Sequence, residues 1–224
     1  MYRGIGKDYG SESAEVADLI LGRRPDARTL LDVACGTGGH LEHLRHRFTV
    51  AGFERSRHMA ALAREKVPGV DVHEGDMRRF DLGSTFDAVT CLFSSIGYMT
   101  TTDDLARALG AMVAHLTPGG VLVVDPWLFP ERWKDGHVSA VAASEPGLAV
   151  ARVTTSYRMG RRSVLEFHYT LATAEGVDRF SERHEMGLFT RAEYEKAFAA
   201  AGATDLAYEP GGFDERGRFV ATRA

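Results

Sequence analysis

The feature that most constrains this 224-residue chain is the stretch LLDVACGTGGHLEHL, residues 30–44. An apolar run passes into a glycine-rich turn and then into a pattern with helical spacing. Gly36 and Gly38 permit backbone conformations that other residues avoid, and the N-terminus of a following helix offers free N–H groups to a polar ligand. The stretch therefore predicts a strand, a ligand-binding turn and a helix in direct succession.

Strand-like and helix-like segments alternate through the first 127 residues. Strand-like runs occupy residues 29–35, 49–54, 70–76, 86–93 and 120–127, and helical patterns occupy 41–48, 59–67 and 105–116. This alternation predicts an α/β, Rossmann-like fold with a mainly parallel sheet and helices on both faces. Two closing strands, at 204–210 and 217–224, complete a predicted seven-stranded sheet.

The alternation of strand-like and helix-like segments stops near residue 138. Leu165, Phe167, Tyr169 and Leu171 alternate with polar residues, which is the period of an antiparallel sheet with one covered face. We therefore predict one domain, residues 1–224, in which residues 138–188 form an inserted antiparallel sheet. A capping box at Thr190 and Glu193 predicts the start of a helix after it, and Gly202 predicts where that helix ends.

Charge and composition narrow the class of partner. The formal charge of -4 and the pI near 6.1 argue against a sequence-independent nucleic-acid binder, which would carry a basic face. No apolar run approaches membrane-spanning length, and the first residues lack the apolar core of a signal peptide. We expect a cytoplasmic protein that binds small molecules, with no nucleic-acid or membrane partner.

No metal site is expected. Cys35 and Cys91 do not have metal-type spacing and are predicted to be small buried thiols. His40, His43 and His46 are spaced three apart, but the apolar residues among them predict a buried stripe that leaves the histidines facing outward.

The glycine-rich turn can be matched to a ligand class. A dinucleotide-binding turn would have a third glycine where Leu41 stands, which weakens the case for NAD. Glu54 ends the second strand, where a carboxylate can accept from both hydroxyls of a ribose. Asp76 follows the third strand and could accept from an adenine amino group, with the Met77 backbone donating. Each residue alone also fits a solvated acid or a turn, but together they favour an adenosyl ligand.

The chain resembles the class I S-adenosylmethionine-dependent methyltransferases, and within them the N-methyltransferases of dTDP-linked amino deoxysugars in macrolide biosynthesis. The stretches that carry the resemblance are GIGKDYG, LLDVACGTG, GDMRRFDLG, TCLFSSIGYM, VDPWLFPE, LFTRAEYEKAFAAAG and EPGGFDERGRF. The resemblance implies S-adenosylmethionine as cofactor and dimethylation of the sugar amine. It also implies a homodimer. The implied cofactor residues are Ala34, Gly36, Glu54, Asp76, Met77 and Leu92, and we expect Tyr9 to cover the cofactor's amino-acid end.

The same resemblance implies that the sugar nucleotide meets Tyr98, Trp127 and Arg216. Tyr98 follows the fourth strand, where it could orient the amine or relay its proton. Trp127 and Phe129 could wall the pocket or belong to the core. Arg216 is the candidate for the diphosphate and Lys7 a second one. At Arg218 the family usually has an apolar residue.

Two alternative functions remain open. A related methyltransferase acting on another N, O or C acceptor would keep the cofactor residues without needing Arg216. A non-catalytic module that binds S-adenosylmethionine would retain Glu54 and Asp76 but form no product.

Overall fold

A computed structural model describes residues 7–211 and 215–224. The helices are α1 (Tyr9–Arg23), α2 (Leu41–Leu44), α3 (Arg57–Lys66), the 3-10 helix η2 (Ser95–Tyr98), α4 (Thr102–Ala114) and α5 (Arg191–Ala200). The main sheet contains β1 (Thr29–Val33), β2 (Thr49–Glu54), β3 (Asp71–Glu74), β4 (Phe86–Cys91), β5 (Leu116–Val124), β10 (Ala203–Glu209) and β11 (Arg218–Arg223).

The seven strands have the order β10-β11-β5-β4-β1-β2-β3. The pairs from β5 to β3 are parallel, whereas β11 is antiparallel to both β5 and β10. The chain builds outward from β1 through β2 and β3, and then returns to β4 on the other side of β1. Ligands of such sheets bind where the strand order reverses, which here is the carboxyl edge between β1 and β4.

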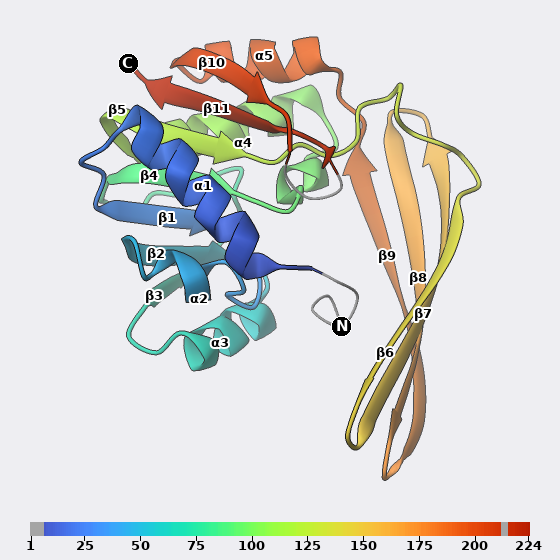
Figure 1. Cartoon of the computed structure of the whole chain (residues 1–224). Coiled ribbons are helices and arrows are strands. Elements are labelled where there is room, and N and C mark those ends of the chain that lie inside the picture. The colour runs from blue at the N-terminus through green and yellow to red at the C-terminus, as the bar shows by residue number, and fades with distance from the viewer. Residues whose placement is uncertain (1–6, 212–214) are drawn as a thin grey trace.

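Helices cover both faces of this sheet (Figure 1), and an apolar layer lies between the helices and the sheet on each face. Side chains of α1, α2 and α3 pack with Leu30 of β1, and side chains of α4 and α5 pack with Leu31 and Val33 on the other face. Neighbouring residues of β1 thus point to opposite faces, and both faces are buried, as the alternation of strands and helices predicted. The predicted class I methyltransferase fold is confirmed.

A second sheet stands beside the main one (Figure 1). It consists of β6 (Val138–Glu145), β7 (Leu148–Met159), β8 (Arg162–Thr173) and β9 (Gly176–Gly187), all antiparallel and in chain order. The inserted antiparallel sheet is confirmed and has four strands. β6 was not predicted as a separate strand because its alternating residues are mostly alanine and serine, which carry little apolar contrast.

Helix α1 was also not predicted. Its buried residues Ser13, Val16, Ala17 and Ile20 do follow helical spacing, but the serine weakens the apolar pattern. Asp8 caps the helix by accepting from the Ser11 N–H. The predicted capping box at Thr190 and Glu193 is present, and both cysteines are buried. Within the described residues, no helix is both long and apolar enough to cross a bilayer.

Candidate active site

Strained backbone marks the carboxyl edge of the main sheet. Ala34 follows β1 with φ near 60°, and Phe93 and Ser94 follow β4 with φ of 54° and 60°. Residues with a Cβ rarely adopt this left-handed region, and such strain collects where a chain is shaped for function. Contacts hold the β4 turn in place: the Phe93 N–H donates to Asp125 Oδ2 at 3.0 Å, and Ser94 Oγ donates to the Pro126 carbonyl at 2.6 Å.

The glycine-rich turn is tied to Glu54 at the end of β2. Glu54 Oε2 accepts from the Gly36 N–H at 2.9 Å, and its Oε1 accepts from the Ser56 N–H at 2.8 Å. A Cβ added to Gly36, whose φ is 58°, would meet no atom within 4 Å, so the turn faces open space. Gly38 packs closely on Ala63, and a Cβ at Gly39 would collide with the Tyr9 ring. The turn is therefore packed underneath and open on its ligand side.

Asp76 lies one strand further along the same edge. Its carboxylate accepts from the Arg78 N–H at 3.0 Å and forms an ion pair with the Arg78 guanidinium at 2.5 Å. The hydrogen bonds from Arg78 lower the pKa of Asp76 to about 2, so it stays an acceptor at physiological pH. Met77 is half-buried against the core and Leu92 is buried.

A buried charged cluster lies beneath the N-terminal end of α1. Lys7 is buried and donates to Glu12 Oε2 at 2.5 Å, and His40 Nε2 lies 3.0 Å from the same oxygen. The predicted outward position of His40 is wrong: it is only 6% exposed, and the Tyr9 ring packs edge-on against it. Desolvation lowers the pKa of Lys7. The helical spacing of His40 could not reveal this contact, because its partner Glu12 lies on a helix that the sequence pattern did not predict.

Two further carboxylates are buried behind the turns. Asp32 accepts from Thr90 Oγ1 at 2.8 Å, and burial raises its pKa to about 6. Asp125 lies 3.3 Å from Arg218 Nε, and burial raises its pKa as well. The buried Arg218, where the resembled family usually has an apolar residue, thus supplies a cation next to a buried acid.

The predicted acceptor residues Arg216 and Trp127 lie together. The Arg216 guanidinium lies 4.4 Å from the centre of the Trp127 ring, and its Nη1 donates to Ser94 Oγ at 3.2 Å. The Trp127 indole N–H donates to Ser163 Oγ of β8 at 2.8 Å. A planar guanidinium stacked on an aromatic ring is oriented for bidentate contact with phosphate oxygens.

Tyr98 ends η2 and is 46% exposed. Its hydroxyl lies 2.7 Å from His184 Nδ1 on β9, a partner that the sequence analysis did not identify. Phe129, in contrast, lies in the core among Tyr194, Tyr208 and Phe219. Of the two places predicted for it, the pocket wall or the core, the structure shows the core. A direct contact of Phe129 with the sugar stays a prediction, as do the roles of the other site residues.

The donor set fits S-adenosylmethionine. The open side of Gly36 leaves room for a ligand, the Glu54 carboxylate is held rigid by two backbone N–H groups, and Asp76 is an ionised acceptor at the next strand end. These three features suit the amino-acid, ribose and adenine parts of the cofactor in turn.

Comparisons with known proteins agree with this geometry. Residues 30–120 match the model of a methyltransferase domain. The chain is 48% identical to the dTDP-3-amino-3,4,6-trideoxy-alpha-D-glucopyranose N,N-dimethyltransferase of Streptomyces venezuelae, covering 100% of this chain and 94% of the relative. It is 43% identical to the dTDP-4-amino-2,3,4,6-tetradeoxy-D-glucose N,N-dimethyltransferase of Saccharopolyspora spinosa, covering 97% and 88%.

A solved structure gives the same result. CalS10, an amino pentose methyltransferase of Micromonospora echinaspora involved in calicheamicin biosynthesis, was solved with S-adenosylmethionine bound. It is 51% identical, with a TM-score of 0.91 over 100% of this chain and 94% of its own. Fold, site and matches define an S-adenosylmethionine-dependent methyltransferase of class I. Within that class, the chain belongs to the family of dTDP-amino-sugar N,N-dimethyltransferases.

Proposed function

We propose that the protein transfers two methyl groups to the amino group of a dTDP-linked 3-amino deoxysugar in antibiotic biosynthesis. The observation that carries the proposal is the Arg216–Trp127 pair beside Ser94, a preorganised cation at the carboxyl edge of the sheet. A nucleotide sugar brings a diphosphate to this edge, and a guanidinium fork is the side chain best suited to hold it.

The separate roles of the cofactor and of the protein follow from the chemistry of methyl transfer. The bound cofactor supplies a methyl group already activated on a sulfonium, so the chain has to position a neutral amine and keep water out. Tyr98 stands at the exposed edge of the site, where its hydroxyl can orient the amine. Lys7 is the weaker phosphate candidate, because it is buried in an ion pair with Glu12.

The amino position on the sugar needs a direct test, since the relatives named above act on 3-amino and 4-amino sugars. The experiment is a panel of dTDP-3-amino and dTDP-4-amino deoxysugars, with S-adenosylmethionine, scored by mass for one or two added methyl groups. We expect two additions to a 3-amino sugar. Absence of methylation on every dTDP-amino sugar, with turnover of another amine, alcohol or carbon acceptor, would refute the proposal.

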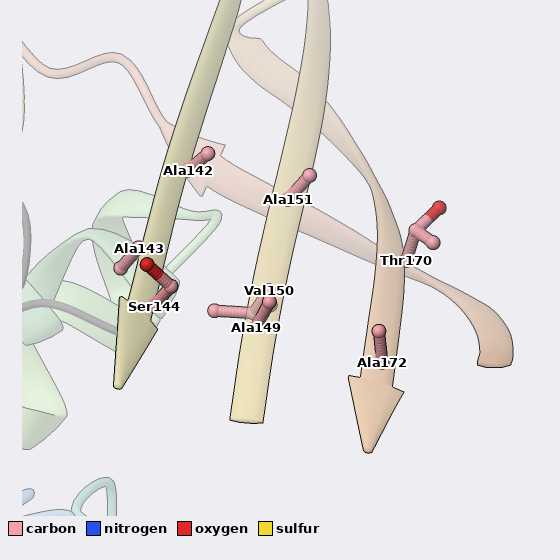
Figure 2. Close-up of a pocket in the computed structure, with 8 residues that line it drawn as sticks. All are labelled: Ala142, Ala143, Ser144, Ala149, Val150, Ala151, Thr170 and Ala172. Atoms are coloured by element: carbon pink, nitrogen blue, oxygen red, sulfur yellow. The ribbon is translucent and has the colours of Figure 1, made fainter. Parts of the chain in front are cut away.

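We also propose that the protein is a homodimer joined through the outer face of the four-stranded sheet. Val138, Val153 and Val177 share that face and are 67%, 51% and 61% exposed. A hollow toward the other end of β6 and the start of β7 is lined mainly by small side chains, namely Ala142, Ala143, Ser144, Ala149, Val150, Ala151, Thr170 and Ala172 (Figure 2). All of these except Ala143 and Val150 share the face of the three valines by strand register. Small residues beside exposed valines let a second backbone approach closely, and a second copy brings the same apolar surface.

Light scattering in solution tests the dimer. We expect Val153→Glu to give monomers, while Leu148→Glu, an exposed residue on the opposite face of the same sheet, leaves the dimer intact. A monomeric wild-type protein would contradict the proposal. The cytoplasmic location and the absence of a nucleic-acid partner stay predictions from composition.

A further inference from the structure

The contact between Tyr98 and His184 joins the two sheets of the molecule next to the acceptor edge. Tyr98 comes from η2, directly after β4 of the main sheet, and His184 comes from β9 of the antiparallel sheet. Their side chains meet at 2.7 Å, Tyr98 Oη to His184 Nδ1. The antiparallel sheet thus delivers an imidazole to the one exposed hydroxyl predicted to meet the substrate amine.

A third group determines how this pair is protonated. His184 Nε2 lies 3.4 Å from Glu182 Oε2, and an ionised carboxylate only accepts hydrogen bonds. This contact favours the tautomer with hydrogen on Nε2, in which the Nδ1 lone pair accepts from the Tyr98 hydroxyl. The Phe167 ring, centred 4.8 Å from the imidazole, holds it from β8.

Double methylation creates a need for such a group. After the first transfer the sugar nitrogen is a secondary ammonium, which has no lone pair for a second transfer until it loses a proton. A phenol is a poor base near neutral pH, whereas an imidazole exchanges protons there. Tyr98 alone therefore cannot remove the proton efficiently.

We propose that His184 is a positioning residue that receives this proton through Tyr98 and thereby allows the second methyl transfer. In this step the ammonium N–H bond breaks and an O–H bond forms on Tyr98, while the original Tyr98 O–H bond breaks and an N–H bond forms at His184 Nδ1. The imidazolium next to Glu182 then releases a proton to solvent from Nε2. The inference rests on the proposed N,N-dimethyltransferase function.

Charged and titratable side chains reach this imidazole from several elements of the described part of the chain. Tyr98 approaches it from η2 and Glu182 from its own strand, and Arg152 of β7 lies on the Phe167 ring that His184 also contacts. These three neighbours are unchanged in the His184 variants, so a pH profile of the second methyl transfer compared between wild type and variants reports on His184 itself.

The experiment compares His184→Asn with His184→Ala on dTDP-3-amino-3,6-dideoxyglucose, with both products counted by mass from about pH 6.5 to about pH 9. Asparagine keeps an acceptor for the Tyr98 hydroxyl but cannot take its proton. We expect both variants to release about tenfold or more singly methylated sugar near neutral pH. The first transfer should change little in His184→Asn, and the defect should shrink as the pH rises and solvent takes the proton.

The control is His46→Asn. His46 is exposed and follows α2, outside the antiparallel sheet and its proposed dimer face, and we expect wild-type products from this variant. An unchanged ratio of products in both His184 variants would overturn the inference. Failure of the wild-type enzyme to methylate any dTDP-amino sugar would instead count against the proposed function.

A second measurement needs no sugar. Nitrogen-15 chemical shifts of the His184 ring in the free enzyme should show hydrogen on Nε2 and a hydrogen-bonded Nδ1, and Tyr98→Phe should shift only the Nδ1 signal. Hydrogen on Nδ1 in the wild-type protein would refute the relay.

Discussion

Removal of the Glu54 carboxylate tests how the cofactor is held. In the structure this buried group accepts from Gly36 N at 2.9 Å and from Ser56 N at 2.8 Å, and it has further lone pairs for two ribose hydroxyls. A hydrogen bond to a charged group contributes about 1.5–3 kcal/mol, and about 1.4 kcal/mol corresponds to a tenfold change in affinity. We expect Glu54→Ala to weaken the binding of S-adenosylhomocysteine at least about tenfold.

The same substitution should also lower the thermal stability, because Gly36 and Ser56 lose their acceptor. For a chain of this size the melting temperature falls about 2–4 °C for each kcal/mol lost. Isothermal titration calorimetry gives the affinity, and thermal unfolding shows how much of the protein is folded at the titration temperature.

Glu74→Ala is the matched control, since Glu74 pairs with Glu54 across β2 and β3 but forms a surface ion pair with Arg64. Exposed pairs contribute about 0–1 kcal/mol, so this variant should bind the cofactor product like wild type. A folded Glu54→Ala protein whose affinity lies within about twofold of wild type would refute the assignment.

Three other predictions concern the acceptor site and the buried charges. Arg216→Ala should raise KM for the dTDP-sugar about tenfold or more, and Arg216→Lys should also raise this KM, while the affinity for the cofactor stays unchanged. If turnover of a free amino sugar is impaired to the same extent, Arg216 has a structural role. Burial raises the pKa of Asp32, so the native chain binds more protons than the unfolded chain between about pH 4 and pH 6, and stability decreases as the pH rises through that window. Asp32→Asn should remove this decrease, as measured by denaturant unfolding at several pH values; its persistence in the variant would assign it to another group. Arg218→Met should destabilise the fold by about 3–5 kcal/mol, because it leaves the Asp125 carboxylate buried without its cation. Adding Asp125→Asn to this variant should recover most of the lost stability in the same denaturant assay. If the double variant recovers no stability, the pairing of Arg218 with Asp125 is contradicted.

Much of the fold could be predicted because its patterns are local. The segment TVAGFE was predicted as residues 49–54 and forms β2 over those residues. The other strands of the main sheet were placed to within a few residues, because apolar runs flanked by turn residues define a buried strand. The helix pattern at residues 105–116 corresponds to α4, which begins three residues earlier because Thr101 caps it.

The site was predictable where a residue's place along one strand decides its role. Gly36 and Glu54 end neighbouring parallel strands, so their meeting follows from the alternation of strands and helices. The contact of Arg216 with Trp127 also involves residues that the family resemblance named, although their distance could not be deduced.

The α/β order, the glycine-rich turn and the chemical type of the cofactor site follow from local sequence patterns, since they depend on short-range periodicity and on the positions of strand ends. Three contacts depend on the packing of distant elements: His40 is buried against Glu12, Arg218 lies next to Asp125, and His184 contacts Tyr98. The last two residues are 86 positions apart, and they meet only because the antiparallel sheet turns one face toward the carboxyl edge of the main sheet. Packing between elements sets such contacts, and no local pattern of polarity encodes them.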